Sequence, residues 1–403
     1  MKIPFSPPYI DDDVKQEVLS ALESGWITSG PKVLELERLV AEQIGVSHVA
    51  CCNSATSGLM LLLHWYGVTR GDEVIIPAYT YAATALVVIH LGARPVMVDC
   101  NEDFNINIEE IRKKITSKTK AIIPVDIAGW PCDYDQLNAL VNSPEIKAKF
   151  NPTSEVQKVL GRILILSDAA HSLGATYKNL PMGHGADFTV FSFHAVKNVT
   201  TAEGGAMVIN LPEPFNHADV YRTLKLWSLN GQTKDSLAKT NGAGWKYDIV
   251  YPGFKMNMPD ICAAIGVAQL KKYKDQILPA RKKVFDSYVS ALSKHEWVQL
   301  PPLDSTSKVS SYHLFALRIK AISESARDKM IESISAKGVS VNFHFQPLPL
   351  LTVFKNRGYA MEDYPVAYNN YAREISLPIY PGLDSKVDYI VDAVVSAYQE
   401  VSG

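Results

Sequence analysis

The first two thirds of the 403-residue sequence alternate short apolar segments with stretches that have helical spacing. The apolar segments have the length of buried strands and lie at 48–52, 73–77, 95–99, 121–125, 163–167 and 188–193. Helical stretches lie between several of them, at 56–65, 82–91 and 133–141. Parallel strands need long crossover connections, which are usually helices. We therefore predict an α/β fold with a mostly parallel central sheet flanked by helices.

The pattern changes after about residue 260. Two long helices, two strand-like segments and a last helix are predicted there, at 261–278, 280–294, 312–319, 339–345 and 385–401. This order is typical of a smaller α+β unit, and 403 residues exceed what one hydrophobic core usually supports. We expect residues 1–268 to form an N-terminal segment with a large α/β domain, and residues 269–403 to form a small C-terminal α+β domain.

Composition and charge argue against several classes of partner. The formal net charge is −2, which offers no electrostatic basis for binding nucleic acid or an anionic membrane. We find no apolar segment near the roughly 20 residues of a membrane span and no signal-peptide core at the start. The five cysteines are scattered, lack the paired spacing of a metal site and are typical of reduced thiols. We expect a cytoplasmic protein without a bound metal.

Polar residues that can carry chemistry follow four of the predicted strands. Ligands of parallel sheets bind at the carboxyl ends of the strands, where the connecting loops converge. The segments at these ends are 53–58, 78–81, 168–171 and 194–197. Their shared position predicts one crevice more strongly than any single motif does.

Lys197 is the candidate nucleophile of this crevice. It lies between an apolar segment and the pair Gly204 and Gly205, within FSFHAVKNVTTAEGG. A lysine amine can bond covalently to an aldehyde cofactor, and glycines let the backbone approach closely. Most lysines are solvated surface charges, but in apolar, glycine-rich surroundings a lysine carries a desolvation cost. The setting therefore favours a chemical role.

Each neighbouring motif suits a pyridoxal phosphate (PLP) site and also has a structural explanation. The segment 54–56 either offers helix amides to a phosphate or simply caps the helix. Tyr81 can stack on a pyridine ring, although an isolated tyrosine more often packs in a core. Asp168 can pair with a pyridinium nitrogen, and His171 can reach the ring hydroxyl, yet either residue alone is as well explained structurally. Only together do these signals indicate PLP.

In this order, the motifs resemble those of the DegT/DnrJ/EryC1/StrS sugar aminotransferases, which are fold-type-I PLP enzymes. The resemblance covers nearly the whole chain. Besides the lysine motif, it rests on segments 25–31 (GWITSGP), 53–58, 77–81, 168–174, 253–258 (GFKMNM) and 377–383 (LPIYPGL). It implies the fold-type-I architecture and PLP as the cofactor.

The resemblance also implies a cofactor role for each matched residue. Lys197 would hold the cofactor covalently and act in catalysis, and Asp168 would pair with the pyridine nitrogen. His171 would contact the ring hydroxyl, and Tyr81 would stack on the ring. The phosphate would be held by the remaining residues of the set, namely Ala55 through its amide, Thr56, Ser192 and Asn257.

Asn257 matches an asparagine that the neighbouring subunit contributes, so the resemblance implies a homodimer with shared active sites. Segment 342–348 resembles the part of the small domain that reaches over the sugar. Thr28 and His344 are therefore candidate substrate contacts. The implied reaction moves an amino group from an amino acid, with glutamate expected, to a keto group of a nucleotide-linked deoxysugar. Such products belong to surface-polysaccharide or amino-sugar biosynthesis.

Some positions depart from the family pattern. Pro349 stands where many members carry a second histidine, and Asn230 stands where a His-Gly pair is common. Segments 142–160 and 233–245 are longer than usual, and the first is polar and predicted as a surface insertion. Because these positions lie where substrate contacts are expected, the sugar, the nucleotide and the choice between C3 and C4 stay open.

Two other functions fit the same fold. Some relatives are sugar dehydratases, but they carry histidine in place of the lysine, so Lys197 argues against that class. The other alternative is a non-catalytic regulator, which would not need an intact lysine–aspartate pair. Arg222 and Arg373 are both candidates for binding the donor carboxylate, and neither context favours one over the other.

Overall fold

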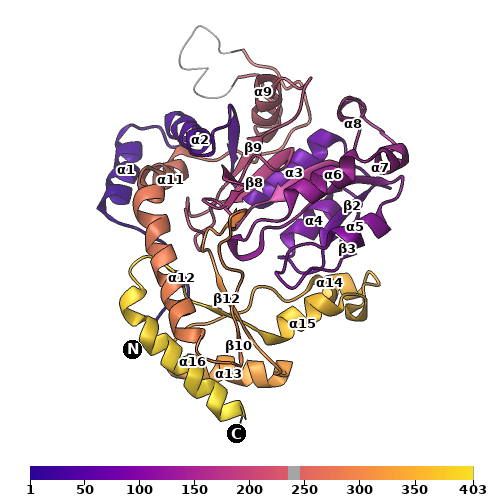
Figure 1. Ribbon diagram of the computed structural model, residues 1–403. Coiled ribbons are helices and arrows are strands. Elements are labelled where there is room, and N and C mark those ends of the chain that lie inside the picture. Colours follow the sequence, from indigo (N-terminus) through magenta and orange to yellow (C-terminus); the bar gives the residue numbers. More distant parts are fainter. Residues whose placement is uncertain (235–245, 403) are drawn as a thin grey trace.

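The computed structural model describes residues 1–234 and 246–402, so most of the predicted insertion at 233–245 lies outside the described residues. Figure 1 shows a large part, which contains the N-terminal two thirds of the chain, above a smaller part formed by the C-terminal third. A seven-stranded sheet is the centre of the large part. Its strands, in spatial order, are β1 (Val49–Cys52), β9 (Gly205–Ile209), β8 (Phe188–Ser192), β5 (Leu164–Asp168), β4 (Thr119–Ile122), β2 (Glu73–Pro77) and β3 (Arg94–Val98).

The sheet is mostly parallel, as predicted. Neighbours from β8 through β3 all pair in parallel, whereas β9 runs antiparallel to both β8 and β1. Six of the strands therefore end at the same edge. The antiparallel strand β9 was not predicted; its first residue, Gly205, was taken as the end of the lysine motif.

Helices cover both faces of this sheet, and β1 shows why. Ala50 and Cys52 belong to one hydrophobic core, while Val49 and Cys51 belong to a second core on the other face. Successive strand side chains point to opposite faces, so a strand buried on both sides is apolar throughout. The first core lies under α3 (Ala55–Tyr66) and α4 (Ala83–His90), and the second under α2 (Pro31–Ile44), α6 (Tyr134–Asn142) and α11 (Asp260–Lys272).

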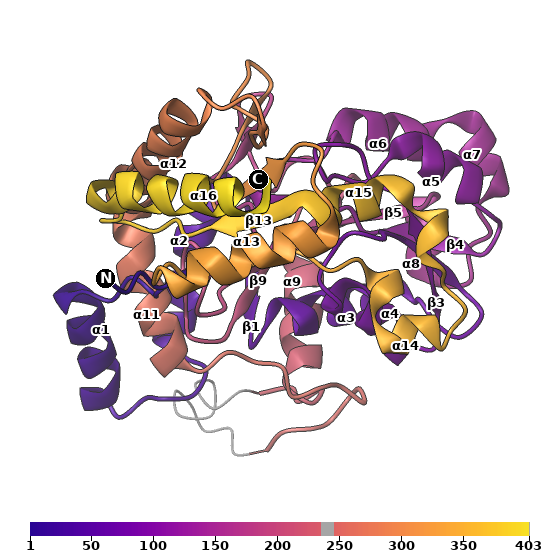
Figure 2. The same ribbon diagram turned by 90° about the horizontal axis from the view of Figure 1, so that it is seen from below.

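The C-terminal part has a core of its own. Its three-stranded antiparallel sheet has the order β10 (Val298–Gln299), β12 (Phe315–Ile319) and β13 (Glu374–Leu377). Three helices pack against this sheet, namely α12 (Leu278–Leu292), α13 (Glu324–Ala336) and α16 (Val387–Ser402). Helices α13 and α16 lie side by side in Figure 2. Ile3 from the N-terminus is buried in the same core. The boundary predicted between residues 268 and 269 falls within α11 and stays a prediction.

Two predicted elements differ from the structure. The strand expected at 339–345 is absent, and this segment makes only single bridges, from Val339 to Ile3 and from Asn342 to Ser376. Its alternation of apolar and polar residues resembles a strand, but each half pairs with a different neighbour. The helix expected at 261–278 ends as α11 at Lys272 and continues as one π-helical turn, Tyr273–Ile277, into α12.

The other elements are short or peripheral. The predicted insertion at 142–160 contains two helices, each capped by a serine side chain. The remaining helices and strands are α1 (Asp12–Glu23), α5 (Ile108–Lys114), α7 (Pro144–Lys149), α8 (Glu155–Leu160), α9 (His217–Ser228), α14 (Thr352–Lys355), α15 (Pro365–Arg373), β6 (Thr176–Tyr177), β7 (Leu180–Pro181) and β11 (Lys308–Val309).

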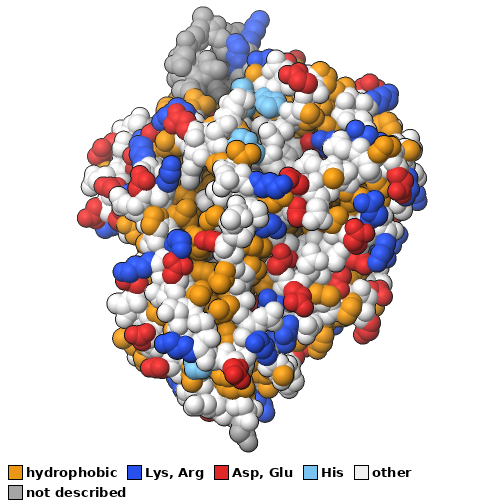
Figure 3. All heavy atoms as spheres, in the orientation of Figure 1, with side chains coloured by type: hydrophobic (Ala, Val, Ile, Leu, Met, Phe, Trp, Pro, Cys, Tyr) orange, Lys and Arg blue, Asp and Glu red, His pale blue; other side chains and the backbone are white. Residues whose placement is uncertain are grey.

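The surface carries both signs of charge, interspersed over the face shown in Figure 3. Across residues 1–234 and 246–402, no helix is long and apolar enough to cross a membrane. Within the same ranges, we find no cluster of three histidine, cysteine or acidic side chains arranged to hold a metal ion.

Candidate active site

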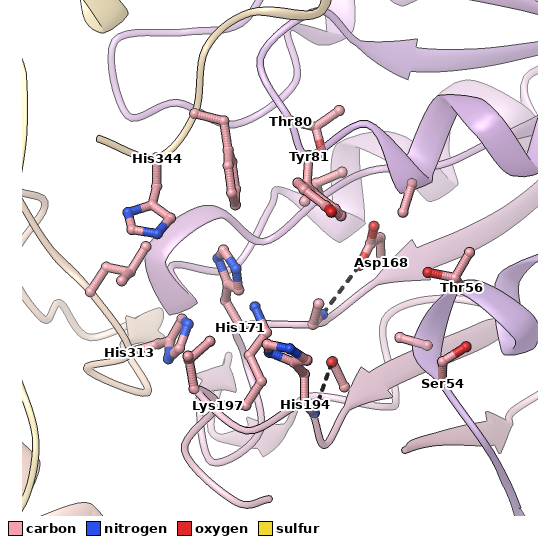
Figure 4. A pocket seen from close by; sticks show the side chains of 18 of the residues that line it. Ser54, Thr56, Thr80, Tyr81, Asp168, His171, His194, Lys197, His313 and His344 are labelled. Carbon is pink, nitrogen blue, oxygen red and sulfur yellow. Dashed lines mark hydrogen bonds between the residues drawn. The ribbon is translucent and has the colours of Figure 1, made fainter. Parts of the chain in front are cut away.

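A pocket of about 430 Å³ opens at the carboxyl edge of the large sheet. The ends of β1, β2, β5 and β8 supply one side of it, and the C-terminal part supplies His313 and His344 on the other (Figure 4). The pocket brings together nearly all of the residues predicted to hold the cofactor, namely Ala55, Thr56, Tyr81, Asp168, His171, Ser192 and Lys197. The convergence of strand ends in one crevice is thereby confirmed.

Lys197 follows β8 in a tight turn, in which its backbone amide donates to the His194 carbonyl at 2.9 Å. Its amino group extends into the pocket toward His171 and Asp168 (Figure 4). Burial lowers the pKa of Lys197 to about 8, and the nearby Asp168 carboxylate opposes this shift. Roughly a tenth of this amine is therefore unprotonated, and nucleophilic, at pH 7, far more than for an ordinary lysine.

Asp168 is the last residue of β5 and is buried. One carboxylate oxygen accepts a hydrogen bond from the Thr84 hydroxyl at 2.8 Å, and the other accepts from the Ala170 amide at 3.3 Å. Burial raises the pKa of Asp168, and these two bonds hold the rise in check. A cationic partner in the pocket would remove the cost of keeping this carboxylate charged.

His171 lies opposite Asp168 across the pocket (Figure 4). Its Nδ1 atom accepts a hydrogen bond from the Ala128 amide at 3.2 Å, so in the neutral ring the proton is on Nε2. Burial lowers the pKa of His171 well below its usual value, and Lys197 lowers it further. The ring is therefore a neutral hydrogen-bond donor toward the pocket.

The N-terminus of α3 forms the part of the pocket farthest from His344 (Figure 4). The Ser54 hydroxyl accepts from the Ser57 amide at 3.1 Å, which leaves the Ala55 and Thr56 amides without a partner within the helix. Gly205 passes directly beneath them: an added Cβ would lie 2.6 Å from the Ala55 nitrogen. Only glycine permits this approach of β9, which explains one of the two glycines after Lys197.

Tyr81 stands at the mouth of the pocket and is 63% exposed. Its ring centroid lies 5.7 Å from that of Phe345, which also stacks against His171. Core packing therefore does not account for Tyr81. The exposed ring is available to a ligand in the pocket.

Two predicted site residues do not line this pocket within the single chain. Thr28 is exposed, and its carbonyl accepts from the Asp260 amide. Asn257 donates to the Ser29 hydroxyl at 2.7 Å and lines a separate cavity of about 600 Å³. Thr28 and Asn257 therefore lie near each other and do not line the pocket that holds Lys197.

Several pocket residues were missed by the sequence analysis. Phe5 and His313 have no local signal, because each reaches the pocket only through the tertiary fold. Thr84, which donates to Asp168 without lining the pocket, has no local signal either. His194 and Glu203 flank Lys197 in sequence and also line the pocket, with 3.6 Å between the imidazole and the carboxylate. Their nearness to the lysine was the only available signal.

The fold is that of the PLP-dependent sugar aminotransferases. The family model of the DegT/DnrJ/EryC1/StrS aminotransferases matches residues 8–395, and the chain belongs to this family. Among curated proteins, it is 34% identical to the spore coat polysaccharide biosynthesis protein SpsC of Bacillus subtilis, over 97% of this chain and 96% of that protein.

Solved structures agree with this assignment. Spr1654 of Streptococcus pneumoniae, described as a candidate sugar aminotransferase, was solved in a PMP form that is 43% identical, with a TM-score of 0.94 over 100% of this chain and 98% of that chain. Its PLP form is 42% identical with a TM-score of 0.94, over 100% of both chains. Helicobacter pylori PseC, an aminotransferase of pseudoaminic acid biosynthesis, is 26% identical with a TM-score of 0.84, over 99% of this chain and all of that one.

The residues of the pocket fit PLP, on which this family depends. A partly deprotonated amine is available for an aldehyde, and a buried carboxylate for a ring cation. A neutral histidine offers a donor for the ring hydroxyl, and two open helix amides offer donors for the phosphate. Each group of the cofactor therefore has a chemically matched partner in the chain.

Proposed function

We propose that this protein is a PLP-dependent aminotransferase that transfers an amino group from an amino acid to a keto group of a nucleotide-linked deoxysugar. The observation that carries the proposal is the amine of Lys197, held in the same pocket as Asp168 and His171. Two relatives support a role in surface-polysaccharide or amino-sugar biosynthesis, since one is named for spore coat polysaccharide and the other for pseudoaminic acid. Glutamate is the expected donor.

When bound, PLP supplies an aldehyde for amines and a ring that withdraws electrons from the substrate carbon. The Nζ atom of Lys197 then serves as the base that takes the proton from the α carbon of the donor. In the second half-reaction, the same Nζ delivers a proton to the sugar carbon that receives the nitrogen. A pKa of about 8 allows this amine to take up and release a proton near neutral pH.

Asp168 and His171 orient the site in this proposal. The Asp168 carboxylate would pair with the protonated pyridine nitrogen of PLP, and Thr84 and Ala170 hold that carboxylate in place. The Nε2–H of His171 would donate to the hydroxyl group of the PLP ring. Ser192 and the amides of Ala55 and Thr56 would bind the phosphate.

We further propose a homodimer in which the active sites are shared. Asn257 and Thr28 do not line the pocket of their own chain, which is the arrangement expected if they serve a neighbour's pocket. His344 lines the pocket of its own chain and is the candidate contact for the sugar. A cytoplasmic location is supported by the five cysteines, all of which are free thiols.

The decisive test combines spectroscopy with turnover. The holoenzyme should show a visible absorbance band that glutamate removes and a nucleotide keto-sugar restores, with ping-pong kinetics. Lys197→Ala should lose the band and lower turnover by about 10²- to 10⁴-fold, whereas the exposed Lys118→Ala should change neither. Full turnover of Lys197→Ala would overturn the proposal.

The same assay separates the other functions. A dehydratase would release a ketodeoxysugar without consuming glutamate. A regulator would show no turnover with any member of a panel of nucleotide keto-sugars. Testing that panel with glutamate also identifies the sugar, the nucleotide and the aminated carbon.

A further inference from the structure

His344 reaches the pocket from the C-terminal part and is connected to two residues deep in that part. Its Nδ1 atom lies 2.9 Å from the hydroxyl oxygen of Ser376. That oxygen lies 2.6 Å from Oε1 of Glu374, and Oε2 of the same carboxyl group accepts the His344 backbone amide at 2.9 Å. Glu374 and Ser376 are fully buried in β13. The three residues form a closed chain of hydrogen bonds.

This arrangement holds both the backbone and the ring of His344. Its carbonyl accepts from the Tyr79 hydroxyl at 2.7 Å, and its ring stacks on Phe5 with centroids 5.3 Å apart. Nδ1 is occupied by Ser376, and within the described residues Nε2 has no hydrogen-bond partner. Nε2 of His344 is therefore available to a ligand in the pocket.

We propose that Glu374 and Ser376 act as a positioning relay, which sets whether His344 presents a hydrogen-bond donor or an acceptor to the pocket. The proposal that this partner is the sugar substrate rests on the proposed function. The relay itself does not, because it follows from the contacts within the chain. Neither Glu374 nor Ser376 touches the pocket, so both act only through His344.

The relay has two consistent arrangements, and they differ by one proton on Glu374. With an ionised Glu374, the Ser376 hydroxyl donates to Oε1, so Ser376 can only accept from Nδ1–H of His344, and Nε2 is left as an acceptor. With a protonated Glu374, the carboxyl group donates to Ser376 and the hydroxyl donates to Nδ1. The proton of the ring is then on Nε2, which becomes a donor.

The electrostatic surroundings of Glu374 place its protonation in an accessible pH range. Burial raises the pKa of Glu374 to about 8, against the opposing effects of the Ser376 hydroxyl, the His344 amide and two arginines. Burial lowers the pKa of His344 to about 3, so the ring stays neutral while Glu374 titrates. The charged or titratable groups that face this pair from the surrounding elements are Arg318, Arg327, Tyr79, Lys197, His171 and His313.

The relay predicts how the pocket recognises its ligand. Below about pH 8, Nε2–H donates, which suits an acceptor such as a sugar hydroxyl oxygen or a phosphate oxygen. Above that pH, Nε2 accepts, and a ligand oxygen without a proton is repelled. Ligand binding through this contact should therefore weaken as the pH rises past about 8.

The test is to read the tautomer directly by ¹⁵N NMR of the holoenzyme labelled at histidine, with His344→Gln used to assign the signal. In the unmodified protein, the proton should be on Nε2 at pH 6.5 and move to Nδ1 by pH 9.5. Glu374→Gln should keep it on Nε2 throughout, because the Gln amide can accept from the His344 amide and donate to Ser376. A control, the exposed Glu362→Gln, should behave as the unmodified protein.

Two results would overturn the relay: the same tautomer at both pH values in the unmodified protein, or a proton that still moves in Glu374→Gln. Steady-state kinetics give a second measurement that a purely structural role would not move. In the unmodified protein, KM for the keto-sugar should rise above about pH 8, and this rise should disappear in Glu374→Gln, whereas the pH dependence that Lys197 gives to kcat should stay. If the tautomer changes as predicted but no keto-sugar reacts, the proposed function fails and the relay stands.

Discussion

The hydroxyl of Thr84 donates to the buried carboxylate of Asp168 at 2.8 Å. The two residues are on different elements, since Asp168 ends β5 and Thr84 lies in the first turn of α4. Thr84 also lies 3.0 Å from Thr80, which lines the pocket. A residue outside the lysine motif therefore orients the carboxylate that we assign to the ring nitrogen.

Thr84→Val should weaken PLP binding. The substitution keeps the shape of the side chain but removes the donor, so the pKa of Asp168 rises further and its carboxylate is held less firmly. Loss of one such hydrogen bond corresponds to roughly 3- to 10-fold in affinity. Titration of the cofactor-free protein with PLP, followed by absorbance, measures this. Thr84→Ser keeps the hydroxyl and should stay within about twofold of the unmodified protein; equal weakening in both variants would argue against the orienting role.

Gly205→Ala should disturb the start of α3. The added Cβ would lie 2.6 Å from the Ala55 nitrogen and 2.8 Å from the Ser54 carbonyl carbon, and backbone atoms cannot move away as a side-chain end can. Overpacking of this kind typically costs about 1–3 kcal/mol. We expect a lower midpoint of urea unfolding and weaker binding of PLP.

Gly58→Ala is the matched comparison for Gly205→Ala. Gly58 lies in α3 itself, and its added Cβ would meet only side chains, the nearest at 3.1 Å. Its loss of stability should be the smaller of the two. A larger loss than that of Gly205→Ala would contradict our explanation of the glycine pair.

His171→Phe should reduce kcat/KM by the same factor across pH 6 to 9, roughly 10- to 100-fold. Burial lowers the pKa of His171 well below its usual value, so the ring is neutral throughout this range and its loss adds no pH-dependent step. His171→Gln, which can still accept from Ala128 and donate to the pocket, should recover part of the activity. A defect confined to pH values below 7 would show that the ring is charged.

Lys197→Met should stabilise the cofactor-free protein at pH 7. The pKa of this amine falls from 10.5 to about 8 on folding, so the folded state disfavours its charged form. Below pH 8 the amine is protonated in both states, and the cost, about 1–3 kcal/mol, is fully present. Between pH 8 and 10.5 the folded state loses its proton first and the cost disappears. Urea unfolding at pH 7 and 10 measures the difference, and Lys118→Met should show none.

Hybrid dimers should show that the active site is shared. Lys197→Ala and Asn257→Ala homodimers should each be weakly active. In a hybrid of the two, one pocket has Lys197 from one subunit and Asn257 from the other, so about half of the normal activity per dimer should return. The reverse finding, a hybrid no better than either homodimer, would mean that Asn257 serves its own chain.

Local sequence patterns predicted the elements of the large sheet well, because a strand buried on both faces is apolar throughout and a helix start has distinctive caps. The ends of β2 were predicted at the observed residues. Strand β9 and the segment 339–345 were not, since both depend on which distant strand is available for pairing. All of the predicted cofactor residues except Asn257 line one pocket, because they lie at the ends of parallel strands, and such strands end at one edge.

The sequence by itself determined the class of chemistry. It places a lysine before a glycine pair, and it places an aspartate and a histidine at the end of the strand that lies next in the sheet. These are local features, and they survive in any arrangement that keeps the strands parallel. Only the tertiary structure decided how those groups are tuned. The lowered pKa of Lys197 and the hydrogen bonds to Asp168 and His171 come from burial and from Thr84 and Ala128, which are distant in sequence. The relay from Glu374 through Ser376 to His344 likewise exists because β13 passes beside the segment that carries the histidine.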